Sequence, residues 1–235
     1  MGKSVKKFAN VIMGWKFAQN MLFSLLPLNK TRSIKRIGAH NYDILTIIFG
    51  SLLGDAYAEK HGNGTRISFY QEGSHKAYLL WLHDLIARKG YCSNNKPKIE
   101  TRIGKNGKLR YIIRFKTYTF TSLNWVHECF YKDNKKVLPI IIDQYMSPLA
   151  LAIWIMDDGG KISSGMKLST NNFTKLEVNR LCILLKKKYN LIATVNMTGI
   201  KDQYIIYIHK ESMKKLANIV KPYIHSSMKY KLNNI

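Results

Sequence analysis

The sequence predicts an α+β fold built from two pseudo-symmetric αββαββα halves. Three observations predict it: one layout of elements that occurs twice, two helices that are apolar on every side, and strands in which polar and apolar residues alternate. The apolar helices would pair at the centre of the molecule, and each half would add one antiparallel sheet.

The repeat is marked by two short apolar runs that each end in aspartate. The first covers residues 44–53 and leads through Gly54 to Asp55, and the second covers 149–156 and leads through Asp157 to Asp158. The two closing aspartates, Asp55 and Asp158, are 158 − 55 = 103 residues apart. Such self-similarity is typical of a fold that has been duplicated within one chain.

The elements that follow each run also correspond. In the first repeat we expect strands up to residue 71, a helix over 78–86, strands over 98–103 and 109–116, and a closing helix over 120–131. In the second repeat we expect a strand over 166–170, a helix over 176–185, strands over 192–198 and 203–208, and a closing helix over 211–223. The predicted organisation is therefore a basic, helical N-terminal extension (1–40), a first repeat (41–134), a linker (135–146) and a second repeat (147–235).

The boundaries of the two central helices are well marked. Asn41 can cap the first helix and Ser147 the second, with Pro148 at its first position, while Gly159 ends the second. Neither helix has an amphipathic stripe, which predicts burial on all sides. The Gly50-x-x-x-Gly54 spacing allows another backbone to approach closely. We expect the helices to pack on each other; the alternative is that each packs in a separate core.

The composition points to a polyanionic partner. The 235 residues hold 38 Lys and Arg against 14 Asp and Glu, a net charge of +24, which favours nucleic acid first and an anionic membrane surface second. Three cysteines without a C-x-x-C pair argue against a disulfide scaffold or a zinc ribbon and fit a reducing compartment. Motifs for a phosphate loop, a serine nucleophile or a dinucleotide fold are absent from the sequence.

The first 42 residues contain no acidic side chain. Their apolar stretch, 8–28, is interrupted by Asn10, Lys16, Gln19 and Asn20, so a membrane span is disfavoured and an amphipathic helix is expected. This helix could serve as a targeting segment, pack on the body of the protein, or be a remnant of an upstream fused reading frame.

The two closing aspartates lie where a carboxylate is electrostatically unfavourable. The C-terminal end of a helix carries the negative end of its dipole, and parallel pairing would bring both ends, with Asp55 and Asp158, together. A divalent cation such as Mg²⁺ or Ca²⁺ would resolve this repulsion, with backbone carbonyls near Gly54 and Asp157 completing its shell. A cation site on a strongly basic protein indicates phosphodiester hydrolysis.

Alternation gives each predicted sheet one polar face, which is suited to phosphates and base edges. The alternative is a solvated face without a partner. The candidate nucleic-acid-binding residues are Arg66, Ser68, Tyr70, Arg102, Lys108, Arg110 and Arg114 in the first repeat, and Lys161, Lys167, Ser169, Thr194, Asn196, Lys201 and Tyr204 in the second.

At these residues the chain resembles the LAGLIDADG homing endonucleases. The signature corresponds to residues 48–56 and, more specifically, to residues 151–159, which end in Met-Asp-Asp-Gly. The likeness covers residue 42 to the C-terminus, including Phe69-Tyr-Gln-Glu and 228–232, and is greatest to the single-chain, two-motif enzymes of the mitochondrial omega-intron type. Phe49 and Trp154 are bulkier than the family's usual residues at a helix interface, so looser packing is expected there.

The resemblance implies a function and further site residues. Asp55 and Asp158 would bind Mg²⁺, with Mn²⁺ as a substitute and Ca²⁺ binding without cleavage, while a saddle of two sheets holds a long double-stranded DNA site and both strands are cut. Lys136 and Lys231 would assist near the metals, although ordinary phosphate contact is an equal alternative. Gln71 and, in the second repeat, Asn171 or Asn172 would position water. With both repeats in one chain, a monomer is expected.

Other functions remain open on this fold. The first alternative is an RNA maturase that assists splicing of its host intron; others are a non-cleaving DNA-binding regulator and a membrane-surface protein acting through residues 1–40. Intact aspartates at 55 and 158 favour the endonuclease over the regulator. Enrichment in Ile, Lys, Asn and Tyr, which have AT-rich codons, suggests a mitochondrial gene or, alternatively, a chloroplast gene.

Overall fold

The two predicted halves are present in the computed structural model, which describes residues 32, 33, 36, 39–104 and 107–232. The first half contains α2 (Tyr42–Leu53), β1 (Tyr57–His61), β2 (Gly64–Glu72), α3 (Lys76–Arg88), β3 (Ile99–Ile103), β4 (Leu109–Lys116) and α4 (Asn124–Phe130). The second half contains α6 (Pro148–Asp158), β7 (Gly159–Ile162), β8 (Gly165–Ser169), α7 (Lys175–Tyr189), β9 (Ala193–Met197), β10 (Tyr204–Ile208) and α8 (Lys210–Val220). The order αββαββα thus occurs twice, as predicted.

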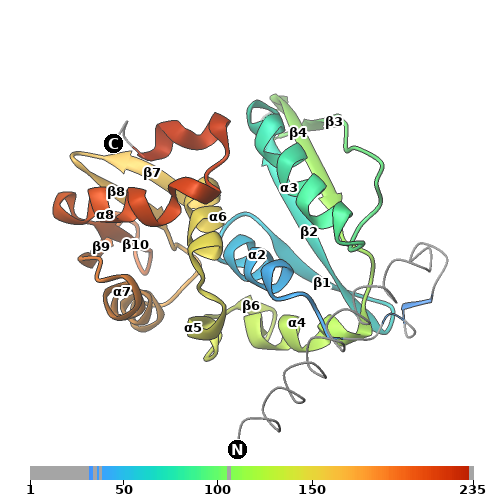
Figure 1. Cartoon of the computed structure of the whole chain (residues 1–235), viewed down its shortest axis with the longest axis horizontal. Helices are drawn as coiled ribbons and strands as arrows, with labels where there is room; N and C mark the ends of the chain where they lie inside the picture. Colours follow the sequence, from blue (N-terminus) through green and yellow to red (C-terminus); the bar gives the residue numbers. More distant parts are fainter. Residues whose placement is uncertain (1–31, 34–35, 37–38, 105–106, 233–235) are drawn as a thin grey trace, which may run out of the picture.

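The two sheets have the same topology. Their strand orders are β1-β2-β4-β3 and β7-β8-β10-β9, and every pair is antiparallel. The sheets lie on either side of the central helices α2 and α6 (Figure 1). In each sheet one face packs on helices: Ile67 and Phe69 of β2 are buried on the side covered by Leu79 and Leu82 of α3.

The central helices pack directly on each other. A Cβ atom added to Gly50 would lie 2.5 Å from the carbonyl oxygen of Ala150, and one added to Gly54 would lie 2.5 Å from Cβ of Asp157. Every residue of α2 from Ile44 to Leu53 is buried. One core cluster contains residues of both halves, so the prediction of a paired interface is confirmed over that of two separate cores.

The bulky residues of the motif helices do not prevent this contact. Phe49 stacks on Tyr145 at a ring-centroid distance of 4.1 Å and contacts Phe130 edge to face, so it is accommodated beside the helix pair. Trp154 is fully buried. Looser packing was expected at Phe49 and Trp154; the close contact between the helices is made elsewhere, by Gly50 against the Ala150 backbone.

The connecting segments are more ordered than the sequence suggested. The predicted closing helix over 120–131 begins only at Asn124, after a 3₁₀ turn at Thr121–Leu123. The predicted linker contains β6 (Lys135–Lys136), which pairs with β5 (Tyr131–Lys132), and the short helix α5 (Ile142–Tyr145). The predicted N-terminal helix lies outside the described residues. Among the described helices, none is long and apolar enough to cross a membrane.

We predict that Gly50→Ala lowers the free energy of unfolding. The added methyl group would press on the Ala150 backbone, and such overpacking costs about 1–3 kcal/mol, more than the roughly 0.5–1 kcal/mol that alanine gains in a helix. Gly160→Ala is the matched control, because its nearest neighbour is the flexible end of Lys167. Urea denaturation of both variants measures the difference; equal stabilities would contradict the close helix contact.

Candidate functional site

Three carboxylates gather where the central helices end. Asp55 follows Gly54, the C-cap of α2, while Asp157 and Asp158 are the last residues of α6. Both lysines of the site, Lys136 and Lys231, interact electrostatically with all three aspartates. The two helices therefore bring their C-terminal ends, and the carboxylates of both halves, into one site.

Gln71 of β2 bridges the two halves. Its side chain is 4% exposed, and Nε2 donates hydrogen bonds to Oδ2 of Asp55 at 2.8 Å and to Oδ1 of Asp157 at 3.0 Å. Its Oε1 lies 3.0 Å from Nδ1 of His75, and since Oε1 can only accept, the proton of this bond belongs to His75. Tyr230, near the C-terminus, reaches Nε2 of the same histidine at 3.4 Å. The predicted polar residue thus contacts the aspartates of both motifs.

The side chain of Asp157 is held inside the protein. The fully buried Tyr78 of α3 donates a hydrogen bond to Oδ1 of Asp157 at 2.9 Å. Burial, followed by the charge of Asp55, raises the pKa of Asp157 well above its usual range. The sequence pointed to the backbone of Asp157 as a ligand, and the side chain indeed faces the interior network rather than a free coordination position.

Each helix end is also capped by a lysine. Nζ of Lys136 donates to the carbonyl oxygens of Ala56 at 3.2 Å and Gly54 at 3.4 Å. Nζ of Lys231 donates to those of Met156 at 2.5 Å and Asp157 at 3.0 Å. An ammonium group at a helix C-terminus opposes the negative end of the dipole. The two lysines therefore occupy equivalent positions in the two halves.

Burial of these ammonium groups weakens their hold on a proton. Desolvation lowers the pKa of Lys136 to about 8, although the three aspartates act in the opposite direction. Desolvation likewise lowers the pKa of Lys231, whose side chain is only 6% exposed. Because the charges of the two lysines and the three aspartates act on one another, these side chains titrate as a linked group.

The donors at this site fit a hard divalent cation. Asp55 and Asp158 supply carboxylate oxygens, and the Gly54 and Asp157 carbonyls keep one lone pair beyond the lysine contacts. Within the described residues, no group of three or more His, Cys, Asp or Glu side chains is arranged to hold a metal by itself. Carboxylate and carbonyl oxygens are the ligands that Mg²⁺ and Ca²⁺ both prefer.

The second half has a simpler environment around its aspartate. Asn171 and Asn172 are exposed in the turn after β8, and in the described part of the chain no hydrogen bond joins either side chain to an aspartate of the site. Instead, Ser169 Oγ donates to the backbone oxygen of Asp158 at 3.5 Å. The structure thus gives no support to Asn171 as the counterpart of Gln71, because β8 ends before this position. Burial, followed by the charge of Asp55, raises the pKa of Asp158 to about 7.

The polar face of the first sheet carries most of its predicted residues. Register places Tyr70 beside Arg114 and Arg102 beside Arg110, with Arg66 on the same face. Lys108 lies in the β3–β4 connection. Ser68 shares this face but is 1% exposed. The prediction that Ser68 contacts a ligand is therefore wrong for this conformation, because alternation identifies the face of a residue but not its exposure.

Acidic residues on this face already pair with several of the predicted cations. Arg66 and Lys116 both contact Glu59, Arg110 contacts Glu72, and Arg114 lies 2.9 Å from Glu100. These pairs are partly exposed and contribute little to stability. They do hold the guanidinium groups in place, and each would have to open or rearrange before the cation could contact a phosphate.

The register of the second sheet corrects two predictions. Lys167, Ser169, Thr194 and Asn196 share one face, and Lys201 lies in the β9–β10 turn. Tyr204 pairs with Met197 and packs against the core, while Lys161 pairs with the buried Met166, so both belong to the opposite face. Tyr207, opposite both Lys167 and Thr194, takes the position that was assigned to Tyr204. The alternation could not be read from the sequence of β10, because its five residues, Tyr204–Ile208, are all aromatic or β-branched and no polar residue marks the exposed face.

Three residues of the site were missed by the sequence reasoning. His75 and Tyr78 follow β2 at the start of α3 and reach Gln71 and Asp157, and Lys116 shares Glu59 with Arg66. The position of His75 offered a signal. It lies four residues after Gln71, and the turn at Gly73–His75 between them can bring its ring back to the Gln71 side chain. Tyr78 looked like a core residue, and only its hydroxyl contact distinguishes it.

We predict a pH-dependent stability in the metal-free protein. The pKa of Asp158 is about 7 in the folded state and about 3.8 ordinarily, so between these values the folded state binds more protons than the unfolded state. Stability should therefore fall as the pH rises from about 4 to about 7. Asp158→Asn should weaken this dependence. Urea midpoints measured with a chelator at pH 5 and 7.5 check it; a wild-type protein that gains stability over this range more than the variant contradicts it.

Comparison with known proteins places the chain in one family. Residues 45–216 match the LAGLIDADG DNA endonuclease family. The chain is 57% identical over 194 residues to the cytochrome b mRNA maturase bI2 of Debaryomyces hansenii, covering 82% of this chain and 74% of that protein. It is 47% identical over 222 residues to the protein of the same name from Saccharomyces cerevisiae, covering 91% of this chain and 52% of that protein. The chain thus spans about half to three-quarters of the length of these relatives.

A relative named as an endonuclease and one solved structure are also similar to this chain. The intron-encoded endonuclease ai4 of Dictyostelium discoideum is 43% identical over 155 residues, covering 64% of this chain and 98% of that protein. The homing endonuclease I-WcaI bound to its DNA recognition sequence has a similar fold, with a TM-score of 0.75 and 26% identity over 91% of this chain and 96% of that one. With its duplicated halves and paired motif helices, the chain belongs to the LAGLIDADG DNA endonuclease family.

Proposed function

We propose that this protein is the site-specific, double-strand DNA endonuclease of a mobile intron and that it depends on a divalent metal. The observation that carries the proposal is the convergence of Asp55 and Asp158, one from each half, at the C-terminal ends of two helices in contact. A pair of equivalent carboxylates suits a reaction that has to be performed twice, once on each strand.

We assign the site residues separate roles in metal binding and in catalysis. Asp55 and Asp158 would hold Mg²⁺, or Mn²⁺ in its place, with help from the Gly54 and Asp157 carbonyls. Bound there, the cation would lower the pKa of water and neutralise the charge of the reacting phosphate. Lys136 and Lys231 hold the helix ends in place and supply positive charge beside the phosphate. Gln71 gives both amide hydrogens to Asp55 and Asp157 and accepts from His75, so it would orient a water near Asp55 through the remaining lone pair of its Oε1.

The polar sheet faces supply the binding surface for the DNA. On the first sheet Arg66, Arg102, Arg110 and Arg114 lie on the face opposite to the helices, and on the second Lys167 does so. Lysine and arginine at these positions match phosphates along a duplex. Because both halves belong to one chain, a single molecule would present both sheets, and we propose that it acts as a monomer.

A second candidate function is that of an RNA maturase for its host intron. It is favoured by the names of the two yeast relatives, which are called cytochrome b mRNA maturases. The same names support a mitochondrial location, since cytochrome b belongs to the respiratory chain. Both functions can reside on one fold, and the intact aspartates keep the endonuclease as the first proposal.

We predict that Asp55→Asn and Asp158→Asn each abolish double-strand cleavage of the intronless host allele while DNA binding persists. Each change removes one carboxylate ligand without changing the size of the side chain, and a chelator should have the same effect on the wild-type protein. A cleavage assay with Mg²⁺, beside a binding assay with Ca²⁺, measures both properties. Tight binding without cleavage by the wild-type protein at any divalent metal would favour the maturase, which splicing of the intron RNA would then test.

We also predict that the two strands are cut unequally in Gln71→Leu. Gln71 contacts the proposed metal ligand of the first half, Asp55, and reaches the second half only at Asp157; among the described residues no side-chain amide contacts Asp158. Loss of such a supporting contact typically lowers activity about 10- to 100-fold. A nicked intermediate should accumulate, whereas Asn172→Leu, at the exposed position of the second half, should cut both strands as the wild-type protein does. Strand-specific end labels report the two rates, and equal slowing of both strands by Gln71→Leu would contradict the assignment.

A further inference from the structure

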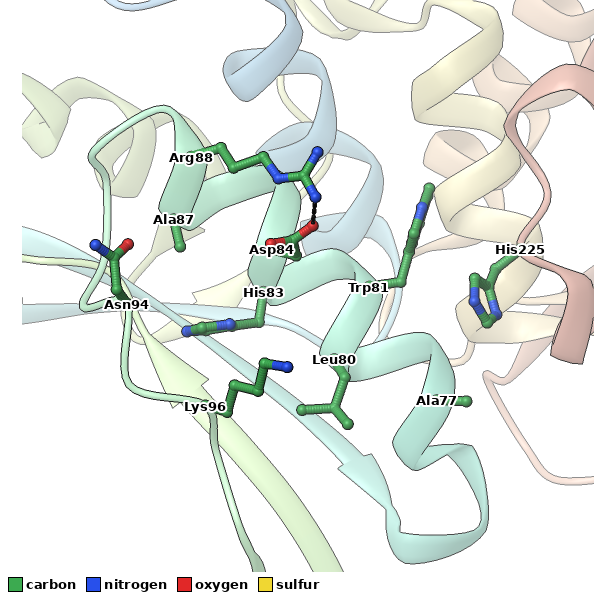
Figure 2. A pocket seen from close by; sticks show the side chains of 10 residues that line it. All are labelled: Ala77, Leu80, Trp81, His83, Asp84, Ala87, Arg88, Asn94, Lys96 and His225. Carbon is green, nitrogen blue, oxygen red and sulfur yellow. Dashed lines mark ion pairs between the residues drawn. The ribbon is translucent and has the colours of Figure 1, made fainter.

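A hollow of about 540 Å³ is lined neither by the aspartates of the site nor by residues of the polar sheet faces. One wall is the outer side of α3, whose opposite side packs on the first sheet; Ala77, Trp81, Asp84 and Arg88 recur there at helical spacing. The segment 94–96 forms a second wall, and His225 closes the end near the second half, as Figure 2 shows. Its volume falls in the range of about 300–1,000 Å³ that is typical of small-ligand sites.

The lining combines flat rings with cationic and amide groups. Trp81 and His225 are both partly exposed, and their ring centroids are 5.6 Å apart at an angle of 42°. Lys96 and Asn94 are exposed on the opposite wall, and Lys96 extends toward Leu80 across the hollow in Figure 2. Aromatic rings stack on bases, and a nearby ammonium group contacts the adjoining phosphate.

The remaining polar groups of the hollow are already engaged. The acidic side chain, Asp84, lies 2.5 Å from Arg88, which offsets its repulsion of an anion. His83 is buried, and its Nε2 lies 2.8 Å from the carbonyl oxygen of Ser93. This contact anchors the wall that carries Asn94 and Lys96. Nδ1 of His225 is also engaged, 2.8 Å from Oγ of Ser227, but its ring face is not. The rings of Trp81 and His225 and the side chains of Asn94 and Lys96 are therefore left to meet a ligand.

The chemistry of this ligand favours an unpaired nucleotide of RNA. A base inside a duplex is stacked on both sides and cannot stack on these rings as well, whereas bases in RNA loops and bulges are unstacked. A net charge of +24 attracts any nucleic acid, but the polar sheet faces lie on the other side of the first sheet from α3. We infer that this hollow binds an unpaired nucleotide of an RNA, on a surface separate from the DNA-binding faces. The inference rests on the maturase proposal.

The test compares RNA and DNA binding by the full chain. The probes are a fluorescent 12-nucleotide single-stranded RNA of mixed sequence, DNA of the same sequence, and duplex DNA carrying the intronless allele. We expect Trp81→Ala and Lys96→Glu each to weaken RNA binding about tenfold and to leave duplex binding unchanged. Trp81→Phe keeps an aromatic ring and should retain most of the affinity. Lys98→Glu is the matched control, because Lys98 is exposed two residues away and does not line the hollow.

Several outcomes would overturn the inference. The first is an equal loss of RNA affinity in Lys96→Glu and Lys98→Glu, and the second is a parallel loss of RNA and duplex DNA binding. The third is binding of uridine monophosphate as tight as that of the RNA, which would assign the hollow to a free nucleotide. Photo-crosslinking of 4-thiouridine RNA gives an independent readout: crosslinks within 77–96 or at His225 support the site, and crosslinks confined to the sheet faces contradict it. A wild-type chain that does not bind RNA would overturn this inference and the maturase proposal together, while DNA cleavage would still test the endonuclease.

Discussion

The close contact of Gly50 with the Ala150 backbone is the constraint on which the rest of the structure depends. At this point a Cβ atom on Gly50 would lie 2.5 Å from a carbonyl oxygen, so only glycine lets α2 and α6 approach this far. The approach joins the two halves through one core and brings both helix ends to the same place. The two sheets then lie on either side of the helix pair (Figure 1).

This geometry concentrates negative charge, and the chain compensates for it in two ways. Lys136 and Lys231 donate to carbonyl oxygens at the helix ends, while Gln71 and Tyr78 donate to the aspartates. These contacts do not neutralise the site, since burial and mutual repulsion still raise the pKa values of Asp157 and Asp158. Such a site gains from binding a cation, and a cation bound there would in turn hold a phosphate that the polar sheet faces had positioned.

Local signals in the sequence predicted much of the fold. The duplicated apolar runs, the capping residues Asn41 and Ser147 and the glycine spacing led to the paired helices, and the charge at their ends led to Asp55 and Asp158. Lys136, Lys231 and Gln71 came from the family resemblance, because their approach to the site depends on tertiary structure. Register was the weak point: Tyr204 and Lys161 were assigned to the wrong face, and the exposure of Ser68 could not be read from alternation. Tyr78 was missed because its hydroxyl reaches Asp157 from a distant part of the chain, whereas His75 was missed although it contacts Gln71 only four residues away.

The central claim is that aspartates from two halves share one electrostatic site, and the pKa of Asp158 measures this most directly. Carboxyl chemical shifts of Asp158, followed by NMR in the metal-free protein, would be compared between the wild type and Asp55→Asn. Because the charge of Asp55 contributes to the raised pKa of Asp158, we expect the variant to have a lower Asp158 pKa, with burial keeping it above the ordinary value. An Asp158 pKa that does not change on removal of the Asp55 charge would show that the two motifs act as separate sites and would contradict the account.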